Sequence, residues 1–210
     1  MASRIIHLAI AGQIADLHPD LDTNRFYLGS VLPDACGDKS AHYSKYVANG
    51  TKKTHDLTRF RKEFGDRLPQ DELYVGCYLH LVQDILFRQT MYEELHFDSR
   101  PAGNVARLHL DYHLTNRYVI QRYGVKVIPF APADLEQEPL WKAHAFFLRD
   151  FLEEMKQDYL DCPEGSTVFF TEEIADQFIE RALKACLTEL EALRSGEGYF
   201  DEVRFAWKRH

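Results

Sequence analysis

The sequence predicts an all-α fold, a multi-helix bundle built as one domain over residues 1–210. Apolar residues recur every three or four positions in several long segments, which is the spacing of one helix face. Capping residues and glycines bound these segments. No segment has the strand, glycine-rich loop and helix order of a nucleotide-binding α/β protein. With 45% hydrophobic residues, the chain can bury a sizeable core.

The first hundred residues alternate helical and irregular patterns. Ser3 is expected to cap a helix that runs to about Leu17. Residues 26–34 are apolar, but a Gly-Ser pair and a proline inside this segment predict that no long regular element forms there. Residues 36–54 are polar and lack periodicity, so a long irregular loop is expected.

The rest of the chain is mostly helical in pattern. A proline-rich connector is expected over residues 125–139, and the apolar tail after residue 198 is expected to dock on the body or on a second copy of the chain. The remaining helices are expected at residues 55–64 (capped by Thr54), 70–96, 104–123 (stopped by Gly124), 139–160 and 171–194.

Composition excludes some classes of function. Acids number 33 and bases 25, and the net charge of −8 argues against a nucleic-acid surface. No signal peptide and no apolar run near 18 residues is evident, so a cytoplasmic protein without a membrane span is expected. The cysteines are widely spaced and indicate a reducing compartment rather than a disulfide framework: Cys36, Cys77, Cys162 and Cys186.

The most apolar stretch, residues 74–88, contains His80 and Asp84, four positions apart. On a helix they share one face, about one turn apart. A buried carboxylate normally has a partner, a metal or a shifted pKa. A metal is one explanation, since imidazole and carboxylate are good zinc ligands. A neutral His–Asp hydrogen bond that joins parts of the core is the other.

Further residues of ligand type lie in apolar or helix-facing positions. His7 sits near the buried face of the first helix, Asp34 follows Pro33 on a stiff turn, and His42 and His55 bracket the expected loop. His109 and His113 form a second pair one turn apart, with Asp111 between them. These three residues could bind a second metal or the substrate, or they could belong to a solvent-exposed helix face.

These residues resemble a known family. Residues 3–125 are similar to the zinc-dependent phospholipase C family, which shares its fold with S1/P1 nucleases, and in particular to its small bacterial members. The resemblance implies a helical bundle of the phospholipase C/P1 nuclease type, which C-terminal helices over residues 126–210 complete. The matching segments are Ile5-Ile6-His7-Leu8-Ala9-Ile10-Ala11, Phe26-Tyr27-Leu28-Gly29-Ser30-Val31-Leu32-Pro33-Asp34 and Tyr78-Leu79-His80-Leu81-Val82-Gln83-Asp84.

The resemblance implies a ligand set. It places the family's early-helix histidine on His7, its loop aspartate on Asp34, which also acts as general base, and its paired HxxxD ligands on His80 and Asp84. The intervening histidine falls on either His42 or His55. The family's N-terminal Trp and a histidine six residues after the HxxxD aspartate have no counterpart, since Thr90 stands at the latter position. One zinc or other divalent ion is therefore expected, and a second is allowed.

A hydrolytic mechanism follows as a hypothesis. The metal would lower the pKa of a bound water to about 7, and Asp34 or Asp84 would orient it as catalytic residues. Arg88 would stabilise charge on a small phosphoester substrate. Two alternatives stay open. One is an HD-type phosphohydrolase that uses the adjacent His55-Asp56 pair. The other is a non-catalytic helical protein with a structural metal or plain His–Asp core pairs.

Overall fold

The computed structural model describes residues 2–127, 135–160 and 163–208. Within these ranges the protein is mostly helical, as predicted, but it also has a small antiparallel sheet, with strands in the order β1-β2-β3, that the sequence analysis did not predict. The α-helices are α1 (Arg4–Leu17), α2 (Thr23–Val31), α3 (Leu57–Phe64), α4 (Glu72–Gln89), α5 (Asn104–Tyr123), α6 (Pro139–Ala143), α7 (Leu148–Leu160) and α8 (Glu172–Ser195). The strands are β1 (Ser44–Val47), β2 (Lys52–His55) and β3 (Trp207–Lys208).

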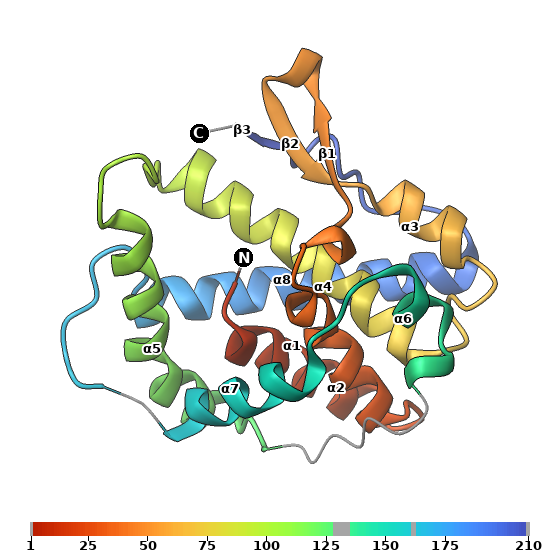
Figure 1. Ribbon diagram of the computed structural model, residues 1–210, viewed down its shortest axis with the longest axis horizontal. Helices are drawn as coiled ribbons and strands as arrows, with labels where there is room; N and C mark the ends of the chain where they lie inside the picture. The colour runs from red at the N-terminus through yellow and green to blue at the C-terminus, as the bar shows by residue number, and fades with distance from the viewer. Residues whose placement is uncertain (1, 128–134, 161–162, 209–210) are drawn as a thin grey trace.

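Helix α4 runs through the middle of the molecule, and the sheet lies beside one end of the helical body (Figure 1). Every residue of α4 from Leu73 to Phe87 is buried. A helix that is apolar almost all round is expected to lie inside a bundle. Helices α1, α2, α3 and α8 pack around it, and the sheet contacts its C-terminal part. A π-helical turn, Thr90–Glu94, continues α4 and replaces the regular end expected near residue 96.

Two glycines let α2 and α4 approach to backbone contact. A Cβ on Gly29 would lie 2.2 Å from the Leu73 carbonyl oxygen, and a Cβ on Gly76 would lie 2.4 Å from the Phe26 carbonyl oxygen. The prediction that the Gly-Ser pair breaks regular structure is therefore wrong, because α2 continues through Gly29 and needs it. The short 3₁₀ turn Leu32–Ala35 follows directly and carries Asp34.

Helix boundaries agree with the sequence at most ends. Ser3 and Thr171 accept hydrogen bonds from the third helical N–H of α1 and α8, and Gly124 ends α5 in the left-handed conformation. The predicted cap of α3 is wrong. Asp56, not Thr54, caps α3 by accepting from the Arg59 N–H, since Thr54 already belongs to β2.

The loop predicted over residues 36–54 is wrong in its second half. Residues 44–55 form the antiparallel β1–β2 hairpin, which projects from the body (Figure 1). Its turn contains Ala48-Asn49-Gly50, all at positive φ. Asn-Gly is the strongest short hairpin signal in a sequence, so this turn was detectable.

The helix predicted over residues 139–160 is interrupted. Residues 144–147 lie extended between α6 and α7, where the Phe147 N–H donates to the Ala35 carbonyl and the Gly37 N–H donates to the Ala145 carbonyl. These bonds to the segment after Asp34 replace helical ones. Of the predicted connector, residues 128–134 lie outside the described residues, as does Cys162, while Cys36, Cys77 and Cys186 are free.

The C-terminal tail packs on its own chain. Trp207 is buried and pairs with Lys53 of β2, and the Glu202 carbonyl accepts a hydrogen bond from Thr54. The tail's apolar side chains thereby cover the body, one of the two outcomes expected. Among the helices that the structure describes, none combines the length and apolarity needed to cross a membrane.

We predict that Gly76→Ala destabilises the protein by about 1–3 kcal/mol, because the added methyl group meets backbone that cannot move aside. Chemical denaturation measures this. Gly12→Ala in α1 is the matched control, since the nearest atom to its Cβ is 3.6 Å away. There the better helix propensity of alanine should leave stability equal or raise it by up to about 1 kcal/mol. An equal effect of both changes contradicts the role of the glycine contact.

Candidate metal centre

Six side chains from distant parts of the sequence meet beside α4. They come from α1, the two 3₁₀ turns after α2, strand β2 and α4 itself: His7, Asp34, His42, His55, His80 and Asp84. We call them the His–Asp cluster. The four imidazoles and Asp84 are almost fully buried, whereas 9% of the Asp34 side chain is exposed. The structure thus brings together both histidines between which the sequence could not choose.

Asp84 lies at the centre of the cluster. Its Oδ1 is 3.6 Å from His7 Nε2 and accepts a hydrogen bond from the Ala2 N–H at 3.0 Å. Its Oδ2 faces three imidazoles, 3.7 Å from His42 Nε2, 3.8 Å from His55 Nε2 and 3.9 Å from His80 Nε2. The two oxygens of one carboxylate therefore face different sets of ring nitrogens.

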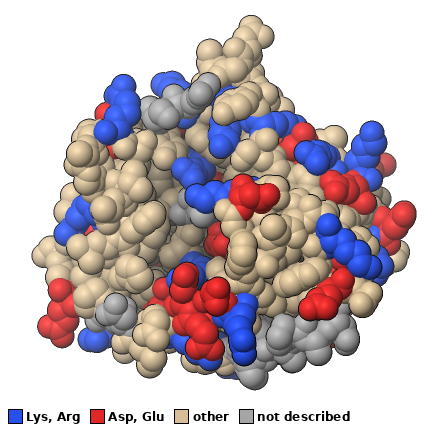
Figure 2. Space-filling model, viewed as in Figure 1, with Lys and Arg blue, Asp and Glu red and all other residues tan. Residues whose placement is uncertain are grey.

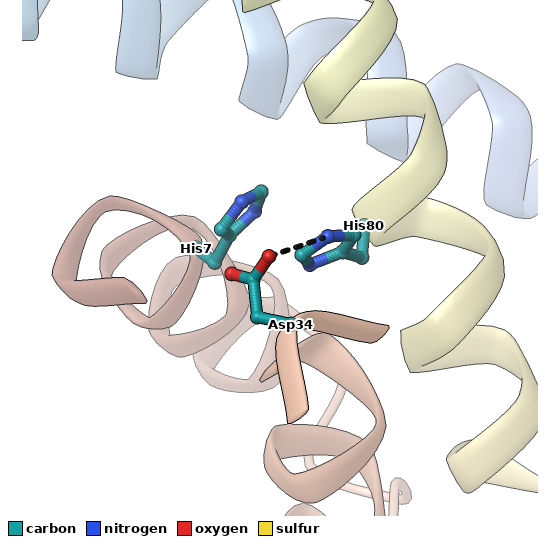
Figure 3. A group of neighbouring side chains, drawn as sticks. All are labelled: His7, Asp34 and His80. Carbon is teal, nitrogen blue, oxygen red and sulfur yellow. Dashed lines mark ion pairs between the residues drawn. The ribbon is translucent and has the colours of Figure 1, made fainter. Parts of the chain in front are cut away.

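Asp34, on the turn after α2, adds a second carboxylate to the cluster. Its Oδ1 lies 3.3 Å from His42 Nε2 and 3.8 Å from His80 Nε2. Figure 3 shows Asp34, His7 and His80 pointing toward one another from three separate segments. Two ligands of a tetrahedral zinc ion lie about 3.3–3.5 Å apart when each is about 2.0–2.1 Å from the metal. The measured separations are close to this spacing.

Hydrogen bonds on the outer nitrogens orient two of the imidazoles. His80 Nδ1 lies 2.9 Å from the Ser30 carbonyl oxygen, and His7 Nδ1 lies 2.8 Å from Gln83 Oε1. The Ser30 carbonyl can only accept, so His80 Nδ1 carries the proton and His80 Nε2 presents a lone pair to the cluster. His7 Nε2 faces Asp84, whose carboxylate raises the His7 pKa. The two rings also stack, with centroids 4.0 Å apart. Metal-ligating histidines are typically held in this way.

Several buried atoms of the cluster have no hydrogen-bond partner among the described residues. They are His7 Nε2, Asp34 Oδ1, both ring nitrogens of His55, His42 Nδ1 and Asp84 Oδ2. An unpartnered buried polar group costs about 1–3 kcal/mol, so unpaired atoms gathered in one place require an explanation. A cation among them would satisfy the inward-facing atoms at once.

The electrostatics favour metal-binding protonation states at four members of the cluster. At His7, burial lowers the pKa but the Asp84 carboxylate raises it, and the net shift is upward. Burial lowers the pKa of His55 and of His80 to about 3, so both rings are neutral near pH 7. Burial alone would raise the pKa of Asp34, but the neighbouring histidines, His80 first, lower it to about 2. Burial also opposes ionisation of Asp84, yet the positive charge of the N-terminal amino group, followed by His7 and His80, keeps its pKa well below the usual value. Neutral imidazoles and ionised carboxylates are the ligand forms.

The donor set fits one metal ion directly. Two groups have ligand atoms within 4.8 Å of one another, His7/Asp34/His80 and His42/His80/Asp84. They share His80, whose other nitrogen is bound to Ser30. One imidazole nitrogen binds one ion, so the two groups describe overlapping positions rather than two independent ions. The two oxygens of Asp84 face different imidazoles, and a second ion, which the resemblance allows, stays a prediction.

The cluster opens into two pockets. Asp34 lines one of about 550 Å³, together with Arg88, His109 and His113. His42 and His55 line another of about 310 Å³, which also contains Arg88. The face seen in Figure 2 is hollowed near its middle, with both basic and acidic side chains at the edge. Small ligands are therefore able to reach the cluster although most of it is buried.

Arg88 lies one turn beyond Asp84 on α4 and lines both pockets. Its Nη1 donates to the Tyr92 hydroxyl at 3.0 Å, its guanidinium lies over the Trp207 ring at 5.9 Å, and its buried Nε has no hydrogen-bond partner among the described residues. Among the ion pairs of the described residues, none includes Arg88. A cation held by aromatic rings beside a pocket is suited to bind an anion.

The predicted second group is only partly at the site. His109 and His113 line the larger pocket, but Asp111 does not. Asp111 is buried elsewhere, where its carboxylate accepts hydrogen bonds from the backbone N–H groups of residues 168–170 and pairs with Arg107. Its proposed metal or substrate role is therefore wrong. Residues two apart on a helix point to opposite sides, so Asp111 cannot share the face of its two neighbours.

Asp56 also points away from the cluster. Its carboxylate caps α3 and binds the Lys45 ammonium group at 2.9 Å. The adjacent His55-Asp56 pair therefore does not converge on one position, as the HD-type alternative requires. Sequence reasoning missed the residues that orient or surround the cluster. Gln83 and Ser30 carry no metal-ligand signal of their own, and Trp207 is remote in sequence.

Comparisons with known proteins found no match to a family model, a curated protein or a solved structure.

We predict that zinc raises the melting temperature of the wild-type protein. At a free metal concentration 100 times the Kd, binding adds about 2.7 kcal/mol, or about 5–10 °C for a chain of this size. Differential scanning calorimetry measures the shift, and elemental analysis measures the bound metal. The His80→Ala/Asp84→Ala protein should show neither, while His18→Ala, outside the cluster, should behave as wild type. A folded wild type that takes up no divalent metal contradicts a metal centre.

Proposed function

We propose that this protein is a metal-dependent hydrolase that acts on a small phosphoester. The observation that carries the proposal is the convergence of six buried imidazole and carboxylate groups, with unpartnered atoms facing one another, at the meeting point of two pockets that share an arginine. The resemblance of residues 3–125 to zinc-dependent phospholipases C and S1/P1 nucleases supports the same chemistry and the same bundle type.

The chemistry divides between the cation and the chain. A bound zinc ion lowers the pKa of a coordinated water to about 7 and polarises a phosphoryl oxygen. His42, His80 and Asp84 would hold the ion, with His7 and His55 beside them. Asp34 is the carboxylate of the cluster that lines a pocket, so it orients the attacking water and accepts its proton. Arg88, which lines the same pocket, binds the phosphoryl oxygens.

The size of the pockets favours a small substrate. A pocket of a few hundred Å³ is the size that takes a small molecule, and a duplex nucleic acid would meet an acidic protein of net charge −8. Zinc is the proposed ion because imidazole nitrogens dominate the donor set, and other divalent ions compete through the carboxylates. A cytoplasmic location and a homodimer formed through the tail stay predictions.

A structural metal is the second candidate, since the cluster is buried enough to hold an ion without catalysis. A structural zinc site is closed by four protein ligands, whereas a catalytic site keeps a position for water or substrate. Inorganic phosphate separates the two possibilities. It should bind the metal-loaded protein and inhibit turnover competitively if the position is open, and should do neither if protein atoms fill the shell.

We predict that Asp34→Asn lowers kcat on aryl phosphoesters by about 10²–10⁴-fold, because the group that takes the proton is lost. Steady-state hydrolysis of p-nitrophenyl phosphate and bis(p-nitrophenyl) phosphate by the metal-loaded protein measures this. Metal content should be retained through the group that contains His42, His80 and Asp84. Asp56→Asn is the matched control and should keep both metal and activity. Loss of metal in Asp56→Asn would instead restore the HD-type alternative.

We predict that Arg88→Gln lowers kcat/KM by about 10²-fold, since it removes a charged donor to the phosphoryl oxygens. Bound metal, measured by elemental analysis, should stay stoichiometric because Arg88 is not a ligand. Arg122→Gln near the end of α5 controls for loss of a positive charge away from the site. Unchanged kinetics in Arg88→Gln would remove Arg88 from the mechanism.

A further inference from the structure

The pockets on either side of the His–Asp cluster differ in charge. The larger one contains Arg4, but Arg4 is paired with Asp158 at 2.6 Å and with Glu154 at 3.4 Å, and both acids also line this pocket. Its other walls are largely apolar and include Phe87, Met91 and Tyr112. Lys39 and Arg88 also line this pocket, so its lining carries charges of both signs.

The smaller pocket is cationic. We call it the hairpin pocket, because β1 and β2 form one wall. Among the described residues that line it, four carry positive charge and none is acidic, in a protein that has more acids than bases: Lys39, Lys53, Arg88 and Lys208. The Ser44 hydroxyl and the Tyr46 phenol add polar groups to the same wall. Clustered cations in a recess concentrate anions.

The alternation of side chains along β2 places one of these cations on the same face as a histidine of the cluster. Side chains two apart on a strand share a face, so Lys53 and His55 of β2 lie on the same side of the sheet, and both line the hairpin pocket. Lys52 and Thr54 point to the other side, where Thr54 donates to the Glu202 carbonyl. Lys208 stands at the rim and faces Glu93 at 3.9 Å. Lys53 therefore shares one wall of the hairpin pocket with His55, a member of the cluster.

We propose that the substrate of this site carries a second anionic group, a carboxylate or phosphate besides the phosphoester, and that Lys53 binds it in the hairpin pocket. The inference rests on the proposed function and specifies its substrate class. Arg88, which lines both pockets, takes the phosphoester at their junction. The remainder of the substrate lies in the larger pocket, whose lining is mixed in charge.

The test uses two probes that differ in one charged group. Glycerol 3-phosphate carries only a phosphate, whereas 3-phosphoglycerate has a carboxylate in place of its terminal hydroxymethyl group. Titration calorimetry on the metal-loaded protein should give an affinity about tenfold higher for 3-phosphoglycerate. In Lys53→Gln the two affinities should become equal, and Lys53→Arg should restore the difference. Because a carboxylate could also contact the metal, the loss in Lys53→Gln is the decisive result.

Lys52→Gln is the matched control, since it removes the same charge from the neighbouring position on the opposite face of the strand. It should keep the tenfold preference. Equal affinities in the wild type, or a preference that survives in Lys53→Gln, overturn the inference even if the protein binds metal and hydrolyses phosphoesters. A Lys53-dependent preference in a protein that binds no metal would support the hairpin pocket and refute the hydrolase proposal.

Discussion

The burial of Asp84 is the constraint on which this structure depends. A carboxylate with no exposed surface must be compensated by nearby charge or hydrogen bonds, and four imidazoles and one backbone N–H surround it. The compensation is incomplete, since Oδ2 lacks a hydrogen bond among the described residues. The fold thus holds unfavourable polar contacts inside its most apolar helix. Its stability must come from the packing around them, and a bound cation would convert that local cost into binding energy.

The scaffold serves this arrangement through close helix contact. Because Gly29 and Gly76 allow α2 and α4 to meet at the backbone, the end of α2 brings the Ser30 carbonyl to His80 and delivers Asp34 on the following turn. A bulkier residue at either position would separate the ligands that come from the two helices. Site geometry and core packing are therefore the same property here, and neither can be altered alone.

The sequence predicted the helices whose signals are local and missed what depends on distant partners. The Ser3 cap, the start of α8 near Thr171 and the Gly124 stop are set by neighbouring residues, so they could be located. The break between α6 and α7 could not, because it depends on hydrogen bonds from residues 145 and 147 to the segment after Asp34. Helical periodicity found the His80/Asp84 pair. Helical periodicity could not predict that the Asp111 carboxylate accepts hydrogen bonds from the backbone of residues 168–170, because that loop lies far along the chain.

The position of Trp207 gives the protein an internal optical reporter. The chain has two tryptophans. Trp141, which lies in α6, stacks on Phe146 and lines neither of the two pockets beside the cluster. The Trp207 ring lies 5.2 Å from the His55 ring and against Arg88. Indole emission responds to nearby charge, so a cation at His55 or an anion at Arg88 alters the fluorescence of one tryptophan and spares the other. Replacing Trp141 with phenylalanine would leave a single emitter whose signal follows occupancy of the centre in real time.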